Sequence, residues 1–315
     1  MMEGQARTMV QGAALCLASL TLALAGTTIP IAGVFFALLT PLPLVLLSVR
    51  HGRATALLGT LAVGAALAVL LGRGYVWIFY LEFGLPALVL AETIRREWAP
   101  ETSVAAGSLA IIGGSLLGLF ILSRDGGGVA AYLLGQLDLA LQEAMALYNK
   151  MGFAPEEPGA VLAAAQQLQK FLLATSPGLF IAVALLITSA NYFLARTGLA
   201  RVSTNPGSDP GFAWKMPDAL VWVFIASAAL LLSGLPIVKQ IGLNGLVVMM
   251  TLYFLQGLAI AAFWIRRLKL PAFVRVLGVA LLLLQPLLLL LLTGVGLFDI
   301  WFVFRRQTLP RPPGA

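Results

Sequence analysis

The sequence is poor in charge. Only 10% of its 315 residues are Asp, Glu, Lys or Arg, whereas an ordinary soluble domain carries about 25%. Hydrophobic residues make up 60% of the chain, and its mean hydropathy is +0.96. So few charges could not cover the surface of such a chain in water, but a surrounding lipid bilayer would remove that need. The composition therefore argues against a soluble enzyme and for a membrane protein.

Cysteine and histidine, which supply many metal sites and much acid–base chemistry, occur once each. Cys16 lies inside the first apolar run, so no disulfide or cysteine metal site can form within the chain. His51 lies in a basic loop, where we expect it beside lipid headgroups rather than as a ligand. The glycines at 126–128 follow no strand and precede no Gly-Lys-Ser/Thr, so they form no phosphate loop. We therefore expect no cofactor, no metal and no enzyme activity.

Long apolar runs are what this sequence has in abundance. In lipid every backbone polar group must be paired internally, so only helices and closed barrels span a membrane. The runs here are continuous rather than alternating, and most are near the ~20 residues that a helix needs to cross a bilayer. They cover residues 9–27, 29–49, 54–72, 75–94, 103–123, 177–195, 219–235, 242–265 and 271–304. We predict an all-α, polytopic transmembrane helical bundle of about nine spans.

The two ends of the chain leave alternatives open. The first run could be a signal peptide, because Ala23-Leu24-Ala25 resembles a cleavage site. Few positive charges precede it and many apolar runs follow it, which favours a membrane span. At the other end Pro286, Gly294 and Gly296 interrupt the last run. Eight or ten spans are therefore the alternatives to nine.

Residues 124–176 differ from the rest because they are polar and carry more acidic than basic side chains. Apolar residues recur on one helical face, which is typical of amphipathic helices lying at a membrane surface. The first face has Leu133, Leu137, Leu141 and Met145, and the second has Val161, Ala165, Leu168 and Leu172. We predict an amphipathic helical hairpin between the fifth and sixth spans. It separates a five-span region, residues 1–123, from a region of about four spans, residues 177–315.

Basic residues indicate the orientation of the chain. The formal net charge is +7, but no basic stripe with interleaved aromatics is present, so we expect no nucleic-acid partner. Lys and Arg in short loops mark the cytoplasmic side. Most of them fall on that side when the N-terminus is cytoplasmic, and the acidic hairpin is then extracytoplasmic. A single last span would leave Arg305, Arg306 and Arg311 outside, so either they are tolerated there or the last apolar run bends and returns.

Small residues recur at four-residue spacing in several runs. Such stripes let helix backbones approach closely in lipid, where burial of apolar surface gives no driving force between helices. They occur as Ala14 and Ala18, as Thr60, Gly64, Ala68 and Gly72, and as Ala106, Ala110, Gly114 and Gly118. Packing within the chain is one interpretation. Docking of another membrane protein is the other, and for it we single out Ala14, Ala18, Gly114 and Gly118.

A few polar side chains lie within apolar runs, where they are costly and usually have a partner or a function. Glu82 either contacts a ligand from the interior of the bundle or extends to the lipid interface. Asn191, Asn244 and Gln256 either bind a ligand or fasten helices together by hydrogen bonds. A ligand site would require these four side chains to converge on one polar cavity.

Three local patterns give further predictions. Glu92 lies four residues before Arg96, the spacing of a helical ion pair. For Asp299 we predict an ion pair with Arg305 or Arg306. Pro41 and Pro43 interrupt the second apolar run.

Three segments together resemble the YybS-like family of uncharacterised bacterial membrane proteins, domain of unknown function 2232. They are Phe212-Ala213-Trp214-Lys215-Met216-Pro217 before Trp222, Gly242-Leu243-Asn244 followed by Tyr253-Phe254-Leu255-Gln256-Gly257-Leu258, and Gly296-Leu297-Phe298-Asp299-Ile300-Trp301 ending at Arg305-Arg306. The resemblance covers most of the chain and implies a bacterial cytoplasmic membrane protein without an assigned activity. The family is also distantly similar to the substrate-binding membrane subunits of energy-coupling-factor transporters. That similarity implies a docking role for Ala14 and Ala18.

Three functional hypotheses follow. The first is a small-molecule binding or transport component, which would have a cavity containing Glu82 and the three amides. The second is a scaffold or assembly factor that binds other membrane proteins through its small-residue faces. The third is an intramembrane enzyme, for which the sequence offers only isolated carboxylates. The lipid bilayer is the one partner common to all three.

Overall fold

The computed structural model describes residues 2–29, 32–123, 128–150, 158–200 and 215–268, and, nearer the C-terminus, 271, 273–274, 278, 285–302 and 304. All regular elements in these stretches are helices, which confirms the predicted helical bundle. The first are α1 (Met2–Thr28), α2 (Gly33–Leu39), α3 (Pro41–His51), α4 (Arg53–Leu71), α5 (Arg73–Phe79), the π-helix η1 (Tyr80–Gly84) and α6 (Leu85–Arg95). They are followed by α7 (Pro100–Leu122), α8 (Val129–Lys150), α9 (Pro158–Ala200), α10 (Leu220–Leu230), α11 (Pro236–Arg267) and α13 (Pro286–Phe302).

Seven described helical segments are long and apolar enough to cross a membrane. They are Thr8–Thr28, Gly33–His51, Arg53–Leu71, Arg73–Arg95, Pro100–Leu122, Ala163–Leu199 and Pro236–Ile265. Two further apolar helices correspond to the remaining predicted spans but are shorter, α10 with 11 residues and α13 with 17. At about 1.5 Å per residue, α10 reaches only about 16 Å, roughly half of the hydrocarbon thickness. Most of residues 269–284 lie outside the described part of the chain.

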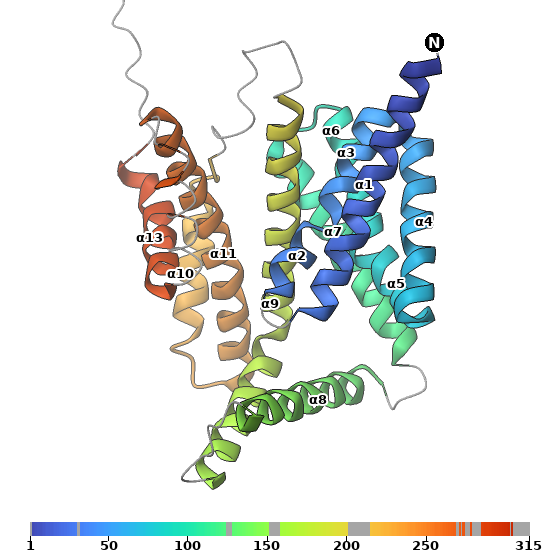
Figure 1. Ribbon diagram of the computed structural model, residues 1–315. Coiled ribbons are helices and arrows are strands. Elements are labelled where there is room, and N and C mark those ends of the chain that lie inside the picture. The colour runs from blue at the N-terminus through green and yellow to red at the C-terminus, as the bar shows by residue number, and fades with distance from the viewer. Residues whose placement is uncertain are drawn as a thin grey trace, which may run out of the picture.

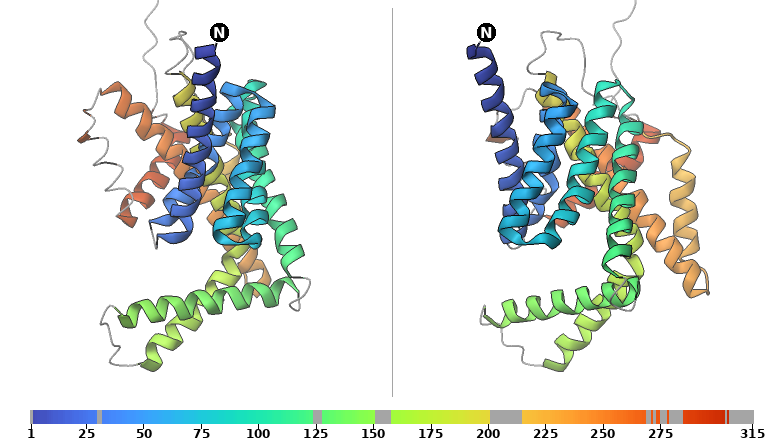
Figure 2. Two further views of the ribbon diagram at one scale, coloured as in Figure 1. Left: turned by 45° about the vertical axis from the view of Figure 1, so that its right-hand side comes forward. Right: turned by 90° about the vertical axis from the view of Figure 1, so that its right-hand side faces the viewer.

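The helices form two groups on either side of α9 (Figure 1). Helices α1 to α7 pack together on one side, α10, α11 and α13 on the other, and α9 contacts both α7 and α11. The further views show α8 lying across the end of the bundle that is opposite to the N-terminus, roughly perpendicular to the spans (Figure 2). The hairpin and the N-terminus therefore lie at opposite ends of the bundle.

The centre of the first group is α3. Its residues Leu44, Val45 and Leu47 are fully buried, because α1, α4, α6 and α9 all pack against this helix. Ala87 and Ala91 of α6 are also fully buried, and such small side chains let helix backbones approach closely in lipid. Large apolar side chains on the outer helix faces are instead exposed, as expected for a chain solvated by lipid tails.

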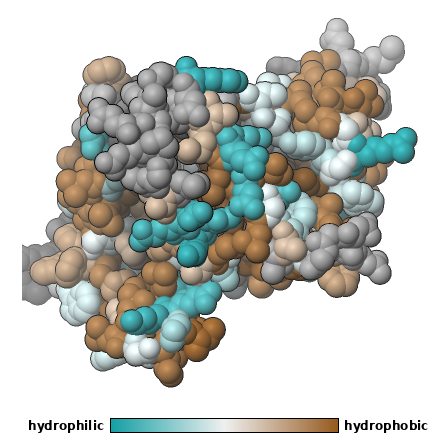
Figure 3. Space-filling model, turned by 90° about the horizontal axis from the view of Figure 1, so that it is seen from below, coloured by the Kyte–Doolittle hydropathy of each residue, from teal (hydrophilic) through white to brown (hydrophobic). Residues whose placement is uncertain are grey.

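The predicted hairpin is formed by α8 and the first part of α9. Its predicted apolar face is the partly buried face of α8: Leu133, Leu137, Leu141 and Met145. Gln169 Nε2 of α9 donates a hydrogen bond of 2.7 Å to Asp138 Oδ1 of α8. Seen from the hairpin end, hydrophilic side chains gather toward the middle of the molecule among hydrophobic ones (Figure 3). This surface is amphipathic, as expected for a helix at a lipid interface.

The second arm of the hairpin differs from the prediction. We expected it to end before a separate sixth span, but α9 is one helix of 43 residues that continues through Pro177. Of its predicted apolar face, Ala165 and Leu172 are partly buried and Leu168 is exposed. The side chain of Val161 lies outside the described residues.

Candidate functional site

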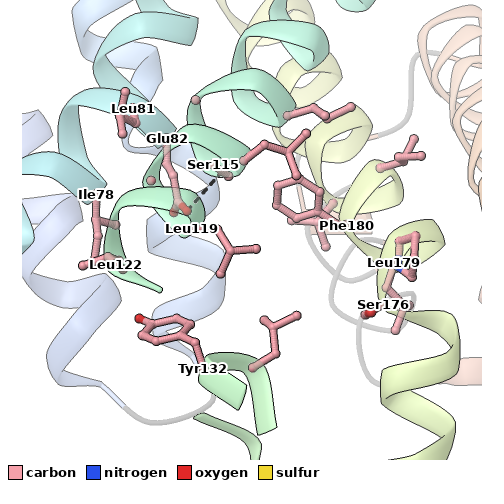
Figure 4. A pocket seen from close by; sticks show the side chains of 18 of the residues that line it. Ile78, Leu81, Glu82, Ser115, Leu119, Leu122, Tyr132, Ser176, Leu179 and Phe180 are labelled. Atoms are coloured by element: carbon pink, nitrogen blue, oxygen red, sulfur yellow. Dashed lines mark hydrogen bonds between the residues drawn. The ribbon is translucent and has the colours of Figure 1, made fainter. Parts of the chain in front are cut away.

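A large pocket lies at the corner where η1, α7, α8 and α9 meet (Figure 4). Its volume is about 800 Å³, within the range of about 300–1,000 Å³ typical of ligand sites. Residues of α5 and η1 form one wall, α7 and α9 form two others, and the apolar face of α8 closes the hairpin end. We call this space the Glu82 pocket, after the carboxylate in its wall.

A local distortion of the fourth span positions Glu82. Pro86 lies four residues after Glu82 and has no N–H to pair with the Glu82 carbonyl, so a regular α-helical turn is excluded there. The chain instead forms the π-helix η1, and the N–H of Leu85 bonds the carbonyl of Tyr80. A π-helical turn changes the direction of the side chains it contains, and such turns are frequent at functional sites.

Helix α7 brings a hydroxyl group to this carboxylate. Gly114 makes the approach possible, because a Cβ atom there would lie 2.6 Å from the carbonyl oxygen of Leu81. The neighbouring Ser115 Oγ donates a hydrogen bond of 3.2 Å to Glu82 Oε1 (Figure 4). A carboxylate has about four acceptor positions. One described hydrogen bond therefore leaves Glu82 with acceptor capacity toward the pocket.

The rest of the pocket is mostly apolar. Leu and Ile side chains dominate the walls, and Trp77, Tyr132 and Phe180 contribute three aromatic rings. Tyr132 projects from α8 at the hairpin end, and Phe180 projects from α9 (Figure 4). None of the residues that line the pocket within the described part of the chain is Lys, Arg or His. Glu82 therefore places a single carboxyl group in an apolar and aromatic surrounding.

The α9 wall of the pocket is kinked, and Asn244 of α11 supports the kink. Pro177 has no N–H for the carbonyl of Leu173, and Ser176 Oγ donates to that carbonyl at 2.9 Å instead. Asn244 Nδ2 donates to the carbonyl of Ala174 at 2.8 Å, and Asn244 Oδ1 accepts from the N–H of Gly178 at 2.6 Å. In a regular helix those two backbone groups would pair with each other. Asn244 therefore fastens α11 to α9 at the kink.

Asn191 has a similar role at another break. Pro41 and Pro43 interrupt the second span between α2 and α3, as the sequence predicted. The fully buried Asn191 of α9 donates from Nδ2 to the carbonyls of Leu38 at 2.7 Å and Ile187 at 2.6 Å. Ser19 Oγ of α1 donates to the carbonyl of Thr40 at 3.0 Å. These side chains satisfy backbone carbonyls at a break where lipid offers no hydrogen-bond donor.

Gln256 is part of a buried network in the second helix group. Its Nε2 donates to Asp299 Oδ2 of α13 at 3.0 Å, and its Oε1 accepts from the N–H of Met216 at 3.1 Å. Asp299 Oδ1 accepts from the N–H of Phe304 at 2.8 Å. For Asp299 we predicted an ion pair with Arg305 or Arg306, two residues that lie outside the described part of the chain.

The four predicted ligand residues do not converge on one cavity. Only Glu82 lines the Glu82 pocket. Asn191, Asn244 and Gln256 each satisfy backbone or side-chain groups at a different helix contact. An amide is suited to this task because it both donates and accepts hydrogen bonds. The described structure therefore favours the interpretation of the three amides as helix fasteners.

The predicted docking residues fall into two classes. Gly114 is buried against η1, and a Cβ atom added to Gly118 would lie 3.4 Å from Leu81 Cδ1. This part of the α7 stripe therefore packs within the chain. On α1, Ala14 is exposed and Ala18 is partly exposed. The α1 pair is therefore the part of the small-residue pattern that another membrane protein can reach.

A charged cluster lies at the end of the bundle opposite to the hairpin. The predicted ion pair of Glu92 with Arg96 is present at 2.6 Å, and Glu92 of α6 also pairs with Arg53 at the start of α4. Arg95 donates to the carbonyl of Ser48. Sequence spacing predicted the i,i+4 pair, whereas the pair with Arg53 depends on tertiary packing. This cluster holds the ends of α3, α4 and α6 together.

Several pocket residues escaped the sequence analysis. Ser115, Ser176 and the three aromatic rings give no sequence signal of their own, because serine and aromatic residues are common in membrane spans. A signal that the sequence analysis missed is Pro86, whose spacing from Glu82 favours a distorted turn at that carboxyl group. Among the described residues, no group of three or more His, Cys, Asp or Glu side chains is arranged to hold a metal ion.

The fold and the lipid-exposed helix faces define the chain as a polytopic helical integral membrane protein. It belongs to the family described as predicted membrane protein, DUF2232, whose model matches residues 17–300. The chain is 23% identical over 320 residues to the uncharacterised protein YybS of Bacillus subtilis (strain 168), an alignment that covers 96% of this chain and 99% of YybS. No solved structure matches the chain.

Proposed function

We propose that the chain is a membrane-embedded binding component for a hydrophobic small molecule, which occupies the Glu82 pocket. The observation that supports this most is the pocket itself, about 800 Å³ of mostly apolar space with the Glu82–Ser115 pair in its wall. Largely apolar pockets with a few placed polar groups are the usual form of small-molecule sites. The function is binding rather than catalysis, because one carboxylate beside one hydroxyl supplies no complete acid–base arrangement.

The contrast with the other buried polar groups strengthens the proposal. Asn191, Asn244 and Gln256 direct their hydrogen bonds into the protein, where they join helices. Glu82 instead lies in a pocket wall and has one described hydrogen-bond donor, Ser115. A carboxyl group within a membrane span is costly and usually has a function. Ligand binding accounts for that cost.

Localisation in the bacterial cytoplasmic membrane, with a cytoplasmic N-terminus, is part of this proposal. The relative in Bacillus subtilis and the apolar spans support the membrane. The orientation is supported by the basic cluster of Arg53, Arg95 and Arg96, which lies at the end opposite to the hairpin. Lys and Arg near span ends favour the cytoplasmic side. The Glu82 pocket then lies toward the extracytoplasmic surface.

Transport is an extension of the binding function. In the energy-coupling-factor transporters that the sequence distantly resembles, a partner docks on small residues of the first helix. The exposed Ala14 and partly exposed Ala18 of α1 offer such a face here. The same face supports the alternative function of a scaffold for other membrane proteins. Replacing Ala14 with Leu would weaken either association without changing the distant pocket.

Photolabelling of the purified protein in lipid nanodiscs tests the proposal. The probe is a hexadecanol that carries a diazirine, and labelled peptides are identified by mass spectrometry. We expect concentrated labelling of peptides from α7, α8 and α9 that face the pocket. Leu119→Trp, which fills the pocket, is expected to reduce that labelling at least about threefold, because the probe loses the volume it occupies.

Leu109→Trp is the matched control. It makes the same substitution in the same helix at a residue that is 67% exposed and does not line the pocket. We expect wild-type labelling from it. Equal labelling of wild type and Leu119→Trp at the pocket peptides, or labelling spread evenly over all lipid-facing helices, would contradict the proposal.

A further inference from the structure

The Glu82 pocket combines a carboxylate, aromatic rings and apolar walls, and we infer that its ligand is a hydrophobic organic cation. This inference rests on the proposed binding function and specifies the chemistry of the ligand. The residues that support it are Glu82, Trp77, Tyr132 and Phe180, which all line the same pocket. The binding group is an ammonium or a similar positive centre, and the rest of the molecule is apolar.

The charge of the ligand follows from the electrostatics of the pocket. A carboxyl group in an apolar surrounding is ionised at little cost only where a positive group or hydrogen bonds compensate its charge, and otherwise it takes up a proton. Within the described part of the chain, Ser115 donates one hydrogen bond to Glu82, and no cationic side chain lines the pocket. A cationic ligand supplies the missing compensation. An anionic ligand of the same size would face repulsion from Glu82.

The aromatic rings point to the same class of ligand. The face of an aromatic ring attracts cations through its quadrupole, and organic ammonium groups are commonly recognised in this way. Tyr132 from α8 and Phe180 from α9 lie on two sides of the pocket that Glu82 also lines (Figure 4). The apolar walls of α7 and α9 accommodate the remainder of the molecule. A small hydrated metal cation would gain nothing from such walls.

Equilibrium binding of two ions of nearly equal shape tests the inference. The probes are tetraphenylphosphonium and tetraphenylborate, measured on the full chain in lipid nanodiscs with empty nanodiscs as background. We expect saturable binding of tetraphenylphosphonium and none of tetraphenylborate. Glu82→Gln is expected to weaken tetraphenylphosphonium binding at least about tenfold, the size of a charge-assisted contact.

Two further variants separate charge from folding. Glu82→Asp keeps the negative charge and is expected to keep the preference for the cation over the anion. Glu101→Gln removes an exposed carboxylate of α7 outside the pocket and is expected to bind as wild type. If Glu82→Gln does not fold, the preference of wild type and Glu82→Asp for the cation over the anion still tests the charge of the ligand.

The outcomes distinguish this inference from the proposed function. Equal binding of both ions, or unchanged binding by a folded Glu82→Gln, would overturn the cationic ligand and leave the binding function in place. Absence of binding by either ion, with the photolabel still concentrated in the pocket, would have the same consequence. Failure of both ions and of the photolabel would overturn the binding function as well.

Discussion

Two regions of this protein contain a carboxylate in an apolar surrounding, and they use it differently. In the second helix group, Asp299 is buried and contacts Gln256 and the backbone of Phe304. In the first group, Glu82 is partly exposed to a pocket and has one described donor, Ser115. Both carboxylates are costly in a membrane. The number and origin of their partners separates a helix fastener from a candidate ligand site.

Backbone packing explains the difference between the two regions. At the contact of α11 with α13, Gly257 and Gly296 bring the two backbones together, and Asp299, three residues after Gly296, is buried. Beside Glu82, α7 packs closely on η1 at Gly114, and the Glu82 pocket lies next to this contact, between η1, α7, α8 and the part of α9 that contains Pro177. Asp299 is thus enclosed by a close helix contact, whereas Glu82 lies on a π-helix at the edge of a pocket.

The largest effect is expected where the α11–α13 contact is closest. Gly296→Leu would place a Cβ atom against the carbonyl oxygen of Tyr253, and backbone cannot move aside as a side chain can. We expect a loss of more than about 3 kcal/mol in the free energy of unfolding, beyond ordinary overpacking. Thermal denaturation followed by size-exclusion chromatography measures it. Gly294→Leu on the same helix has open space around its Cβ and is the control. Equal losses from both variants would remove the packing contrast between the regions.

The second prediction compares Gln256, the partner of Asp299, with Glu82 of the pocket. Gln256→Leu removes partners of Asp299 and of the N–H of Met216 and leaves buried polar groups unsatisfied. We expect a loss of about 2 kcal/mol in stability. Glu82→Gln keeps the volume of the side chain and is expected to change stability by less than about 0.5 kcal/mol. A greater loss from Glu82→Gln than from Gln256→Leu would reverse the assignment of fastener and site.

A third variant tests the support of the pocket wall. Asn244→Leu leaves the N–H of Gly178 without its partner at the α9 kink and removes one of the two described donors to the carbonyl of Ala174, the other being Gln240 Nε2. Hydrogen bonds between membrane helices contribute about 0.6 kcal/mol on average, so we expect a loss of about 1 kcal/mol. The same thermal assay measures the loss of stability, and photolabelling of the pocket peptides shows whether the α9 wall of the Glu82 pocket has changed. Unchanged stability together with unchanged labelling would show that Asn244 has no role in holding the kink.

Much of this fold was predictable from the sequence. The apolar runs predicted the long helices, and the four-residue spacing from Leu133 to Met145 predicted the partly buried face of α8. Pro41 and Pro43 predicted the break in the second span. These features are local, because run length, periodicity and proline act within a few residues of themselves.

The candidate site was only partly predictable, because it depends on contacts between distant segments. Glu82 was recognised as a costly charge, but Ser115 is 33 residues away along the chain. Pro177 suggested a helix end, whereas Ser176 and Asn244 satisfy the groups it leaves free, and α9 continues. The three amides looked equivalent to Glu82 in sequence. Only the structure shows that their partners are backbone groups and, for Gln256, also the side chain of Asp299.

The smallest effect on stability is expected at the contact of α8, which closes the hairpin end of the pocket, with α9. Gln169→Ala removes the hydrogen bond to Asp138 that joins α8 to α9 at an exposed position. We expect a change in stability below about 0.5 kcal/mol. Photolabelling of the pocket peptides is expected to increase, because α8 is held less firmly. A large loss of stability would show that the hairpin belongs to the folding core rather than to the cover of the site.

Labelling with dicyclohexylcarbodiimide tests the central comparison most directly. This apolar reagent enters membranes and modifies protonated carboxyl groups that it can reach, the form that an apolar surrounding favours when no cation is bound, and mass spectrometry locates the modified residues. The pocket exposes Glu82 to such a reagent, whereas the helix contact encloses Asp299. We predict that Glu82 is modified and Asp299 is not. Modification of Asp299 at the same rate, or a Glu82 that stays unmodified, would contradict the account.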